Sequence, residues 1–300
     1  MPIYKQLGKI PRKRHVVFER EGGGLYYEHL MGNKGFTGPA SLMYHLRRPT
    51  RLREVRQLRE LSWQVDPDAR LRPRHLFLHR LGAGGSPVLD RVPALFNADV
   101  AISMVQPDRA DEFFYRNGQG DELLFVSEGE GLLESTMGLL PFGPGDYLVI
   151  PRGIIHRLVP EGSARILVIE SAGAVETPSR YRNEFGQYLE HSPFCERDIR
   201  TPDRLETHDE EGEFVVLTKM GNALHEMVVA NHPFDGVGWD GHYYPWAFNI
   251  RDFEPLVGRL HMPPPIHQTF QSSGFVVCSF VPRLYDFHPE AIPAPYNHSN

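Results

Sequence analysis

The stretch from Asp121 to His156 reads DELLFVSEGEGLLESTMGLLPFGPGDYLVIPRGIIH and decides the fold. It consists of short apolar runs separated by glycines, a pattern typical of antiparallel strands rather than helices. Gly145 and Gly153 fall where tight turns favour a residue without a Cβ atom. We therefore expect a small barrel of antiparallel strands in this part of the chain.

Two motifs in this stretch resemble those of the cupins, which are double-sheet jelly-roll barrels. The second cupin motif, G-x5-P-x-G-x2-H, is matched from Gly145 to His156. The first is matched at Glu122 and Gly129, but Arg116–Gly118 (Arg-Asn-Gly) stand where a cupin has two histidines. Only Glu122 and His156 remain as ligands, whereas open catalytic sites generally keep three. We expect a scaffold without a catalytic metal, in which both side chains are hydrogen-bonded.

Length and composition narrow the class of protein. Three hundred residues suffice for one large or two ordinary domains. A net charge of -6 gives no electrostatic reason to expect nucleic acid or an anionic membrane as a partner. Two cysteines, Cys195 and Cys278, cannot make a disulfide framework and indicate a reducing compartment. The sequence shows neither a signal peptide nor an apolar run of membrane-spanning length, so we expect a soluble, cytoplasmic protein.

Further strands are expected before the barrel motifs. Arg14–Leu30 predicts a hairpin around three consecutive glycines, and Ser41–Leu46 predicts a strand. His75–Leu81 and Asp99–Val105 alternate in polarity and are predicted to be strands that lead into the barrel. Residues 51–63 repeat apolar side chains at three-residue spacing among charges, and fit either a short amphipathic helix or a strand.

After the barrel motifs, Ser163–Ser171 predicts the closing strand of the barrel. A hairpin is predicted around Met220–Asn222, with one strand ending near Leu217 and the other beginning at Ala223. The continuous apolar run Val276–Val281 is typical of a strand buried on both sides.

The composition predicts three parts of the chain. Residues 1–172 would form the cupin-like barrel domain. Residues 173–212 are rich in Arg, Glu and Pro and predict a linker segment. Residues 213–300 follow the linker segment. The expected fold class is all-β, with a cupin-like jelly-roll barrel.

Histidines gather near the end of the chain, among prolines and aromatic residues that favour stiff loops. The sequence contains no G-x-S-x-G elbow, Walker loop, dinucleotide fingerprint or C-x-x-C pair. The candidate chemistry therefore rests on the five histidines of this region: His242, His261, His267, His288 and His298.

The whole chain resembles the homogentisate 1,2-dioxygenases, specifically the shorter bacterial type. The most specific segments are GWDGHYYPWAF (residues 238–248), PPPIHQTF (263–270) and FVVCSFVPR (275–283). This resemblance implies a two-part jelly-roll architecture and a non-haem Fe(II) ion. Residues 213–300 would then begin a C-terminal, iron-binding domain with an incomplete second jelly-roll half. The same resemblance implies that O2 opens the ring of homogentisate, giving maleylacetoacetate in tyrosine and phenylalanine breakdown.

The resemblance also implies roles for individual residues. His298 resembles an iron ligand, and His261 resembles the acid–base histidine that acts on the phenolic hydroxyl. Tyr296 and His267 resemble substrate-binding residues, and His242 and His288 are further candidates for the pocket. Such residues suit the chemistry, because two histidines and a carboxylate leave open positions on Fe(II). A histidine pKa near neutrality suits proton transfer.

One departure from the family leaves two classes of function open. The family follows the ligand at the His298 position with a glutamate and a second histidine, whereas this sequence ends at Asn300. We therefore expect an incomplete iron site in this chain. One interpretation is a homogentisate-type dioxygenase that takes an aromatic acid and O2, or a relative acting on another hydroxylated aromatic acid such as gentisate. The other is a non-catalytic cupin-like binding or scaffold protein. In either case we expect a homo-oligomer.

Overall fold

The computed structural model describes residues 3–68, 70, 72–81, 84–255, 267–282 and 289. The chain is almost entirely β-structure, with twenty strands and four 3₁₀ turns in the described residues: η1 (Leu78–Arg80), η2 (Ser179–Tyr181), η3 (Glu196–Asp198) and η4 (Ile250–Asp252). None of the helices in these ranges is long and apolar enough to cross a membrane.

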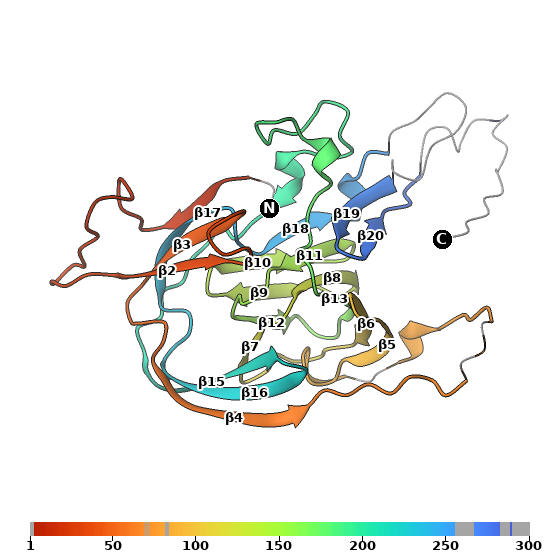
Figure 1. Ribbon diagram of the computed structural model, residues 1–300, viewed down its shortest axis with the longest axis horizontal. Coiled ribbons are helices and arrows are strands. Elements are labelled where there is room, and N and C mark those ends of the chain that lie inside the picture. Colours follow the sequence, from red (N-terminus) through yellow and green to blue (C-terminus); the bar gives the residue numbers. More distant parts are fainter. Residues whose placement is uncertain are drawn as a thin grey trace.

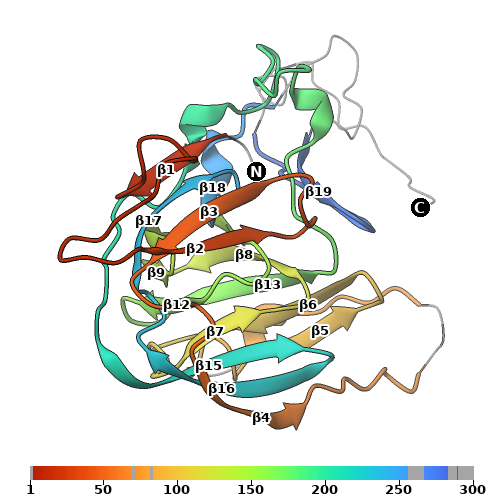
Figure 2. The same cartoon turned by 60° about the vertical axis from the view of Figure 1, so that its left-hand side comes forward.

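Two seven-stranded sheets pack face to face to form the barrel (Figures 1 and 2). The β7 sheet has the order β10 (Gly138–Phe142), β9 (Gly131–Ser135), β12 (His156–Pro160), β7 (Phe114–Asn117), β15 (Glu211–Met220), β16 (Ala223–Asn231) and β4 (Leu52–Glu60). The β8 sheet has the order β14 (Ile199–Arg200), β18 (Trp246–Asn249), β11 (Asp146–Ile150), β8 (Asp121–Glu128), β13 (Arg165–Ser171), β6 (Val100–Val105) and β5 (Val92–Phe96).

Two smaller sheets complete the described structure. The β3 sheet has the order β1 (Lys5–Gly8), β17 (Gly236–Gly241), β3 (Ala40–His45) and β2 (Tyr27–Gly32). A separate hairpin pairs β19 (Gln268–Ser272) with β20 (Phe275–Cys278) and lies at the upper right of Figure 1. All strand pairs are antiparallel except β7 with β15.

The stretch Asp121–His156 forms β8 to β11 and the start of β12, as the sequence predicts. Gly145 and Gly153 end their turns at φ 89° and 85°, conformations that glycine adopts without strain. The all-β, cupin-like barrel is confirmed.

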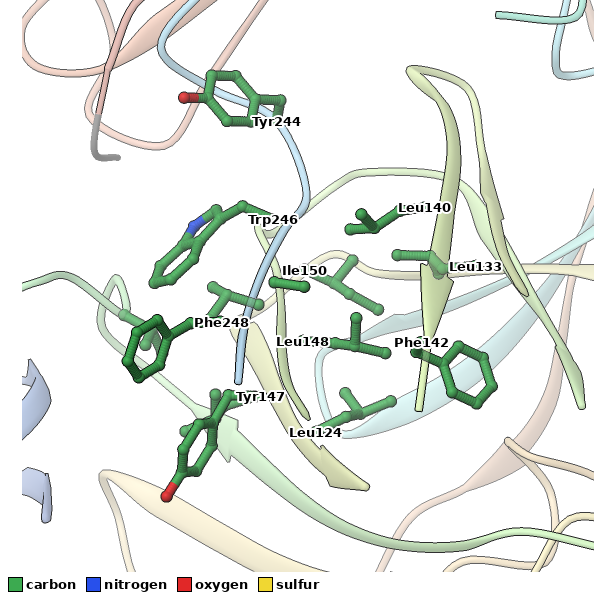
Figure 3. Packing of buried hydrophobic residues seen from close by; sticks show 14 of the residues in the cluster. Leu124, Leu133, Leu140, Phe142, Tyr147, Leu148, Ile150, Tyr244, Trp246 and Phe248 are labelled. Carbon is green, nitrogen blue, oxygen red and sulfur yellow. The ribbon is translucent and has the colours of Figure 1, made fainter. Parts of the chain in front are cut away.

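The apolar core lies between the two facing sheets (Figure 3). Leu133 and Leu140 of the β7 sheet face Leu124 and Leu148 of the β8 sheet, and all four are at most 1% exposed. Trp246 of β18 is also fully buried in this cluster. Burying each such side chain stabilises the fold by about 1.5–3 kcal/mol, so the core holds the two sheets together.

Several predicted elements are confirmed. Ser41–Leu46 corresponds to β3 and Asp99–Val105 to β6. β15 and β16 form the predicted hairpin, whose two turn residues, Gly221 and Asn222, have φ 60° and 56°. Both are left-handed, which matches the twist of a two-residue hairpin.

Residues 51–63 form a strand and not a helix. β4 is the last strand of the β7 sheet, and all of its residues are exposed. Its apolar residues Leu52, Val55 and Leu58 are 44–48% exposed because the β4 end of the sheet extends beyond the packed barrel.

Two predictions for the N-terminal half are wrong. Arg14–Leu30 is not a hairpin over its whole length: pairing across the glycine turn is limited to residues 18–26, and β2 pairs instead with β3 along its whole length. His75–Leu81 contains η1 and no strand among its described residues. Its adjacent apolar residues Leu76 and Phe77 are 47% and 46% exposed, so this apolar run does not reflect burial in a sheet.

Two predictions for later strands also need correction. Ser163–Ser171 contains β13, but β13 lies between β8 and β6 in the interior of its sheet and does not close the barrel. Val276–Val281 contains β20, but this strand is not buried on both sides: Val276 is 59% exposed, and Phe280 beyond its end is 77% exposed. Among the described residues β19 is the single strand that pairs with β20, while Phe275 and Val277 are partly buried against the main core.

The polar segment 173–212 packs on the barrel. It contains η2, η3 and β14, and β14 pairs with β18. The buried ring of Phe194 lies 4.8 Å from that of Phe248. Strands from both sides of the segment share the same sheets. The division into residues 1–172, 173–212 and 213–300, and the second jelly-roll half, stay predictions.

Candidate functional site

A buried ionic network lies inside the barrel at the cupin motif positions. The Arg91 guanidinium donates two hydrogen bonds to the two carboxylate oxygens of Glu122, each at 2.9 Å. The two side chains are 7% and 0% exposed. Such two-pronged pairing fixes the relative orientation of both groups and is stronger than a single hydrogen bond.

A second ion pair, between Lys219 and Glu170, completes the network. The Asn117 amide donates to both carboxylates, at 3.1 Å to Glu122 and 3.0 Å to Glu170. Asn117 and Lys219 come from the β7 sheet, whereas Glu122 and Glu170 come from the β8 sheet. The network is balanced in charge and ties the two sheets together.

Strand register explains why both cations are needed. Glu122 of β8 and Glu170 of β13 are directly opposite each other in neighbouring strands. Like charges in that arrangement destabilise a sheet. Arg91 lies just before β5, where its Nε donates to the Pro87 carbonyl at 2.9 Å, and its Nη1 lies 3.6 Å from Glu170. The arginine therefore compensates both carboxylates.

The network fixes the protonation state of its members. Burial alone would raise the pKa of Glu122, but the charge and hydrogen bonds of Arg91 lower it to about 2. Burial and the Glu122 charge raise the pKa of Tyr115 well above its usual value. Tyr115 therefore stays a phenol, and its hydroxyl donates to Glu122 at 3.0 Å.

His156 lies beside this network and is neutral. Its Nδ1 is 3.0 Å from the Ile154 carbonyl, which can only accept, so Nδ1 carries the proton. Its Nε2 has no hydrogen-bond partner among the described residues. The ring lies edge-on to Tyr115 at 5.4 Å, and burial lowers the pKa of His156.

The barrel interior does not fit an iron ion. Both oxygens of Glu122 are bound by Arg91, so a guanidinium is the cation that faces the carboxylate at this motif position. That leaves His156 Nε2 as a single donor. Within the described ranges, no three His, Cys, Asp or Glu side chains come together in a group that could hold a metal.

A cavity of about 350 Å³ opens next to the network. Its polar side includes Asn117, Glu170 and Lys219, and its aromatic side includes Trp63 and Phe96. The Lys219 ammonium lies 5.2 Å from the centre of the Trp63 ring, which itself lies 5.2 Å from that of Phe96. A pocket of this size, with polar groups on one side and aromatic rings on the other, is large enough for a small organic molecule.

The described residues contain only part of the sequence-predicted site. His261, Tyr296 and His298 lie outside them. His267 is 8% exposed just before β19, and its ring stacks on that of Phe280 at 4.8 Å. It belongs to the β19–β20 hairpin, where its carbonyl accepts from the Ser279 amide at 2.8 Å. Its substrate-binding role stays a prediction.

Two other sequence candidates have been placed. His242 is exposed and lies edge-on to Tyr4 at 5.7 Å between ring centres. Glu122 is hydrogen-bonded as expected, and Tyr115 contacts both Glu122 and His156.

Sequence reasoning missed Arg91, Glu170 and Lys219. Glu170 follows the apolar run ILVI, and Lys219 follows VVLT, each inside a strand. A charge within an apolar strand is a usable signal, because a buried charge needs a partner. Arg91 carries no such signal, since it precedes its strand.

Comparison with known proteins identifies relatives across the chain. The family described as "Homogentisate 1,2-dioxygenase N-terminal" matches residues 78–250. A protein of Saccharolobus solfataricus named "Putative dioxygenase" is 40% identical over 301 aligned residues, covering 100% of this chain and 78% of that protein. A homogentisate 1,2-dioxygenase of Nitrobacter hamburgensis is 33% identical over 66% of this chain. One of Bradyrhizobium diazoefficiens is 30% identical over 66%. The aligned part spans 45% of each of these two enzymes.

Solved structures match over a smaller part. A cupin-2 domain protein of Shewanella frigidimarina aligns with 28% of this chain and 80% of its own, at 19% identity and a TM-score of 0.26.

Proposed function

The chain belongs to the homogentisate 1,2-dioxygenase family, and from this premise we propose that it is part of a dioxygenase that opens the ring of homogentisate with O2 to give maleylacetoacetate. The observation that carries the proposal is the family match over residues 78–250. The two named homogentisate 1,2-dioxygenases support the choice of substrate.

The proposed catalytic groups lie outside the barrel network. His298 is proposed as an iron ligand, His261 as the acid–base residue, and Tyr296 and His267 as substrate contacts. Fe(II), when bound, would supply open positions at which the substrate and O2 meet. The barrel is proposed as the scaffold that supports this region. We further propose a cytoplasmic homo-oligomer that binds neither nucleic acid nor membrane.

O2 uptake with separate substrates tests the proposal. The complete dioxygenase of which this chain is proposed to be part is loaded anaerobically with Fe(II) and then given homogentisate or gentisate, with oxygen consumption and ring-cleaved product measured together. Homogentisate-dependent uptake with one product per O2 is expected. If only gentisate is turned over, the proposed substrate is wrong, but ring cleavage by a dioxygenase remains the proposed reaction.

A non-catalytic binding module is the second candidate function. The pairing of Arg91 with Glu122 favours it, because this pairing occupies the carboxylate of the cupin motif. Failure of the iron-loaded protein to consume O2 with either acid, while binding one of them, would support this candidate.

A further inference from the structure

A second cluster of titratable side chains lies where the β3 sheet meets the β7 sheet. His45 of β3 places Nδ1 2.7 Å from Asp235 Oδ1 and Nε2 3.3 Å from Nδ1 of His29 on β2. The other Asp235 oxygen accepts the backbone N–H of Arg47 at 2.8 Å. His45 and Asp235 are buried, each with 5% of the side chain exposed.

The hydrogen bonds determine where the protons lie. Asp235 is a carboxylate that accepts, so Nδ1 of His45 carries a proton. Nε2 of His45 then accepts from Nδ1 of His29. This leaves Nε2 of His29 with its lone pair. The three residues form a chain of hydrogen bonds that ends in a proton acceptor, and all three line one cavity of about 70 Å³.

The same cavity is lined by Arg48, Arg51 and Arg116. Arg116 of β7 is half-buried, and its guanidinium donates to Thr218 Oγ1 at 3.0 Å and to Met227 Sδ at 3.1 Å. No carboxylate pairs with it among the described residues, whereas Arg51 pairs with Glu211 at 3.0 Å.

Arg116 therefore has no carboxylate within ion-pair distance among the described residues. Asp235 lines the same cavity, but its two oxygens bind His45 and a backbone amide instead of Arg116. A partly buried cation without an anion is costly, and an incoming anion would recover that cost.

We propose that this cavity binds a small oxyanion, held by the Arg116 guanidinium and by His29, which takes up a proton at Nε2 and donates it to the ligand as a hydrogen bond. The volume suits a group of a few atoms, such as a sulfate-like ion or a short carboxylate. It is far below the roughly 300 Å³ or more of pockets for drug-sized molecules. The proposed anion site is thus distinct from the proposed ring-cleaving site, and the proposal of anion binding does not depend on the ring-cleaving function.

Binding would be coupled to proton uptake. Burial, His45 and Arg116 together lower the pKa of His29 to about 4, while Asp235 opposes the shift. Arg48 and Arg51 also line the cavity and add positive charge, and Glu28 is adjacent on β2. An anion next to Nε2 raises the pKa of His29. Between the free and bound pKa values, affinity rises by up to about tenfold for each unit by which pH falls.

Isothermal titration calorimetry with sodium sulfate and with sodium acetate tests the site at pH 6 and pH 8. Neither anion changes its own charge between these values, and the two probes separate a tetrahedral inorganic ion from a carboxylate. Buffers of different ionisation enthalpy report the protons taken up. The variants are Arg116→Met, Arg116→Lys and His29→Gln. The matched control is Arg165→Met, which removes an arginine paired with Glu128 on another strand.

We expect one anion per chain, tighter at pH 6 than at pH 8, and at least tenfold weaker in Arg116→Met. Arg116→Lys should retain part of the affinity. His29→Gln should bind with no proton uptake and little pH dependence, which tests the site even if Arg116→Met does not fold. The proposal is overturned if Arg116→Met and His29→Gln bind as the unaltered protein does. It is equally overturned if Arg165→Met loses as much affinity, or if neither anion binds at roughly 10 mM.

Discussion

Arg91 donates hydrogen bonds to both carboxylate oxygens of Glu122, each at 2.9 Å. His156, the histidine of the second cupin motif, lies near this ion pair, and Tyr115 contacts both Glu122 and His156. The guanidinium supplies the positive charge that the buried glutamate requires. The barrel therefore keeps Glu122 and His156 of the cupin motifs and uses Glu122 for an internal ion pair.

Replacing Arg91 with methionine should strongly destabilise the protein. The change leaves Glu122 buried without its cation, and breaking a buried pair on one side costs about 3–5 kcal/mol. Urea unfolding followed by circular dichroism measures the effect. Arg165→Met, which breaks the more exposed pair with Glu128, should cost at most about 1 kcal/mol. Equal costs for the two variants would show that Arg91 has no special role.

Replacing His156 with alanine should lower stability and leave the iron content unchanged. The ring is 1% exposed, and its Nδ1 hydrogen bond to Ile154 would be lost. A loss of about 1 kcal/mol or more is expected. Elemental analysis of the iron-loaded protein checks the second half of the prediction. A lower iron content in His156→Ala than in the unaltered protein would mean that the barrel does bind metal.

Stability should fall as pH decreases from about 6.5 to about 4. Burial is the main cause that lowers the pKa of both His29 and His232 to about 4. In this window the unfolded histidines bind protons that the folded ones do not, so stability rises with pH. Below about pH 4.5, Glu122 adds to the loss of stability. Its pKa is about 2 in the folded protein, so between pH 4.5 and 2 the unfolded chain binds a proton that the folded protein does not. Urea titrations from pH 3 to pH 8 should show this slope. A flat profile between pH 4 and 6.5 would contradict it.

Replacing His261 with alanine in the complete enzyme should lower kcat by about 10²–10⁴-fold, the usual range for a placed proton-transfer group. Iron should remain bound, because His261 is proposed to act on the substrate hydroxyl and not on the metal. His191→Ala is a suitable control, since that side chain is exposed and is not a candidate for the pocket. An unchanged kcat would transfer the proposed role to His267.

Local turn chemistry could be predicted from the sequence, whereas long-range pairing could not. Gly145, Gly153 and the Gly221–Asn222 turn carry their conformational requirement in the residue itself, and all adopt positive φ as expected. The partner of β2 depends on which strand is adjacent in space, so a glycine turn wrongly suggested a hairpin with residues 14–20.

The buried clusters show the same limit. Arg91 and Glu122 are 31 residues apart, and His45 and Asp235 are 190 apart. In neither pair does the sequence around one residue indicate which residue is its partner. The two cupin-like motifs still led to Glu122 and His156, one residue from each motif, because spacing within a compact motif is preserved in the fold.

The pairing of β1 with β17 places Lys5 opposite Gly241, and β18 adds to β11 from a distance of about one hundred residues. A ribosome must therefore release nearly 250 residues before the first strand of the chain can find its partner. Contacts so distant in sequence slow folding and prolong the exposure of unpaired strand edges. We expect the nascent chain to need chaperones over this interval, with the central strands β8–β13 able to pair first because their partners follow one another closely.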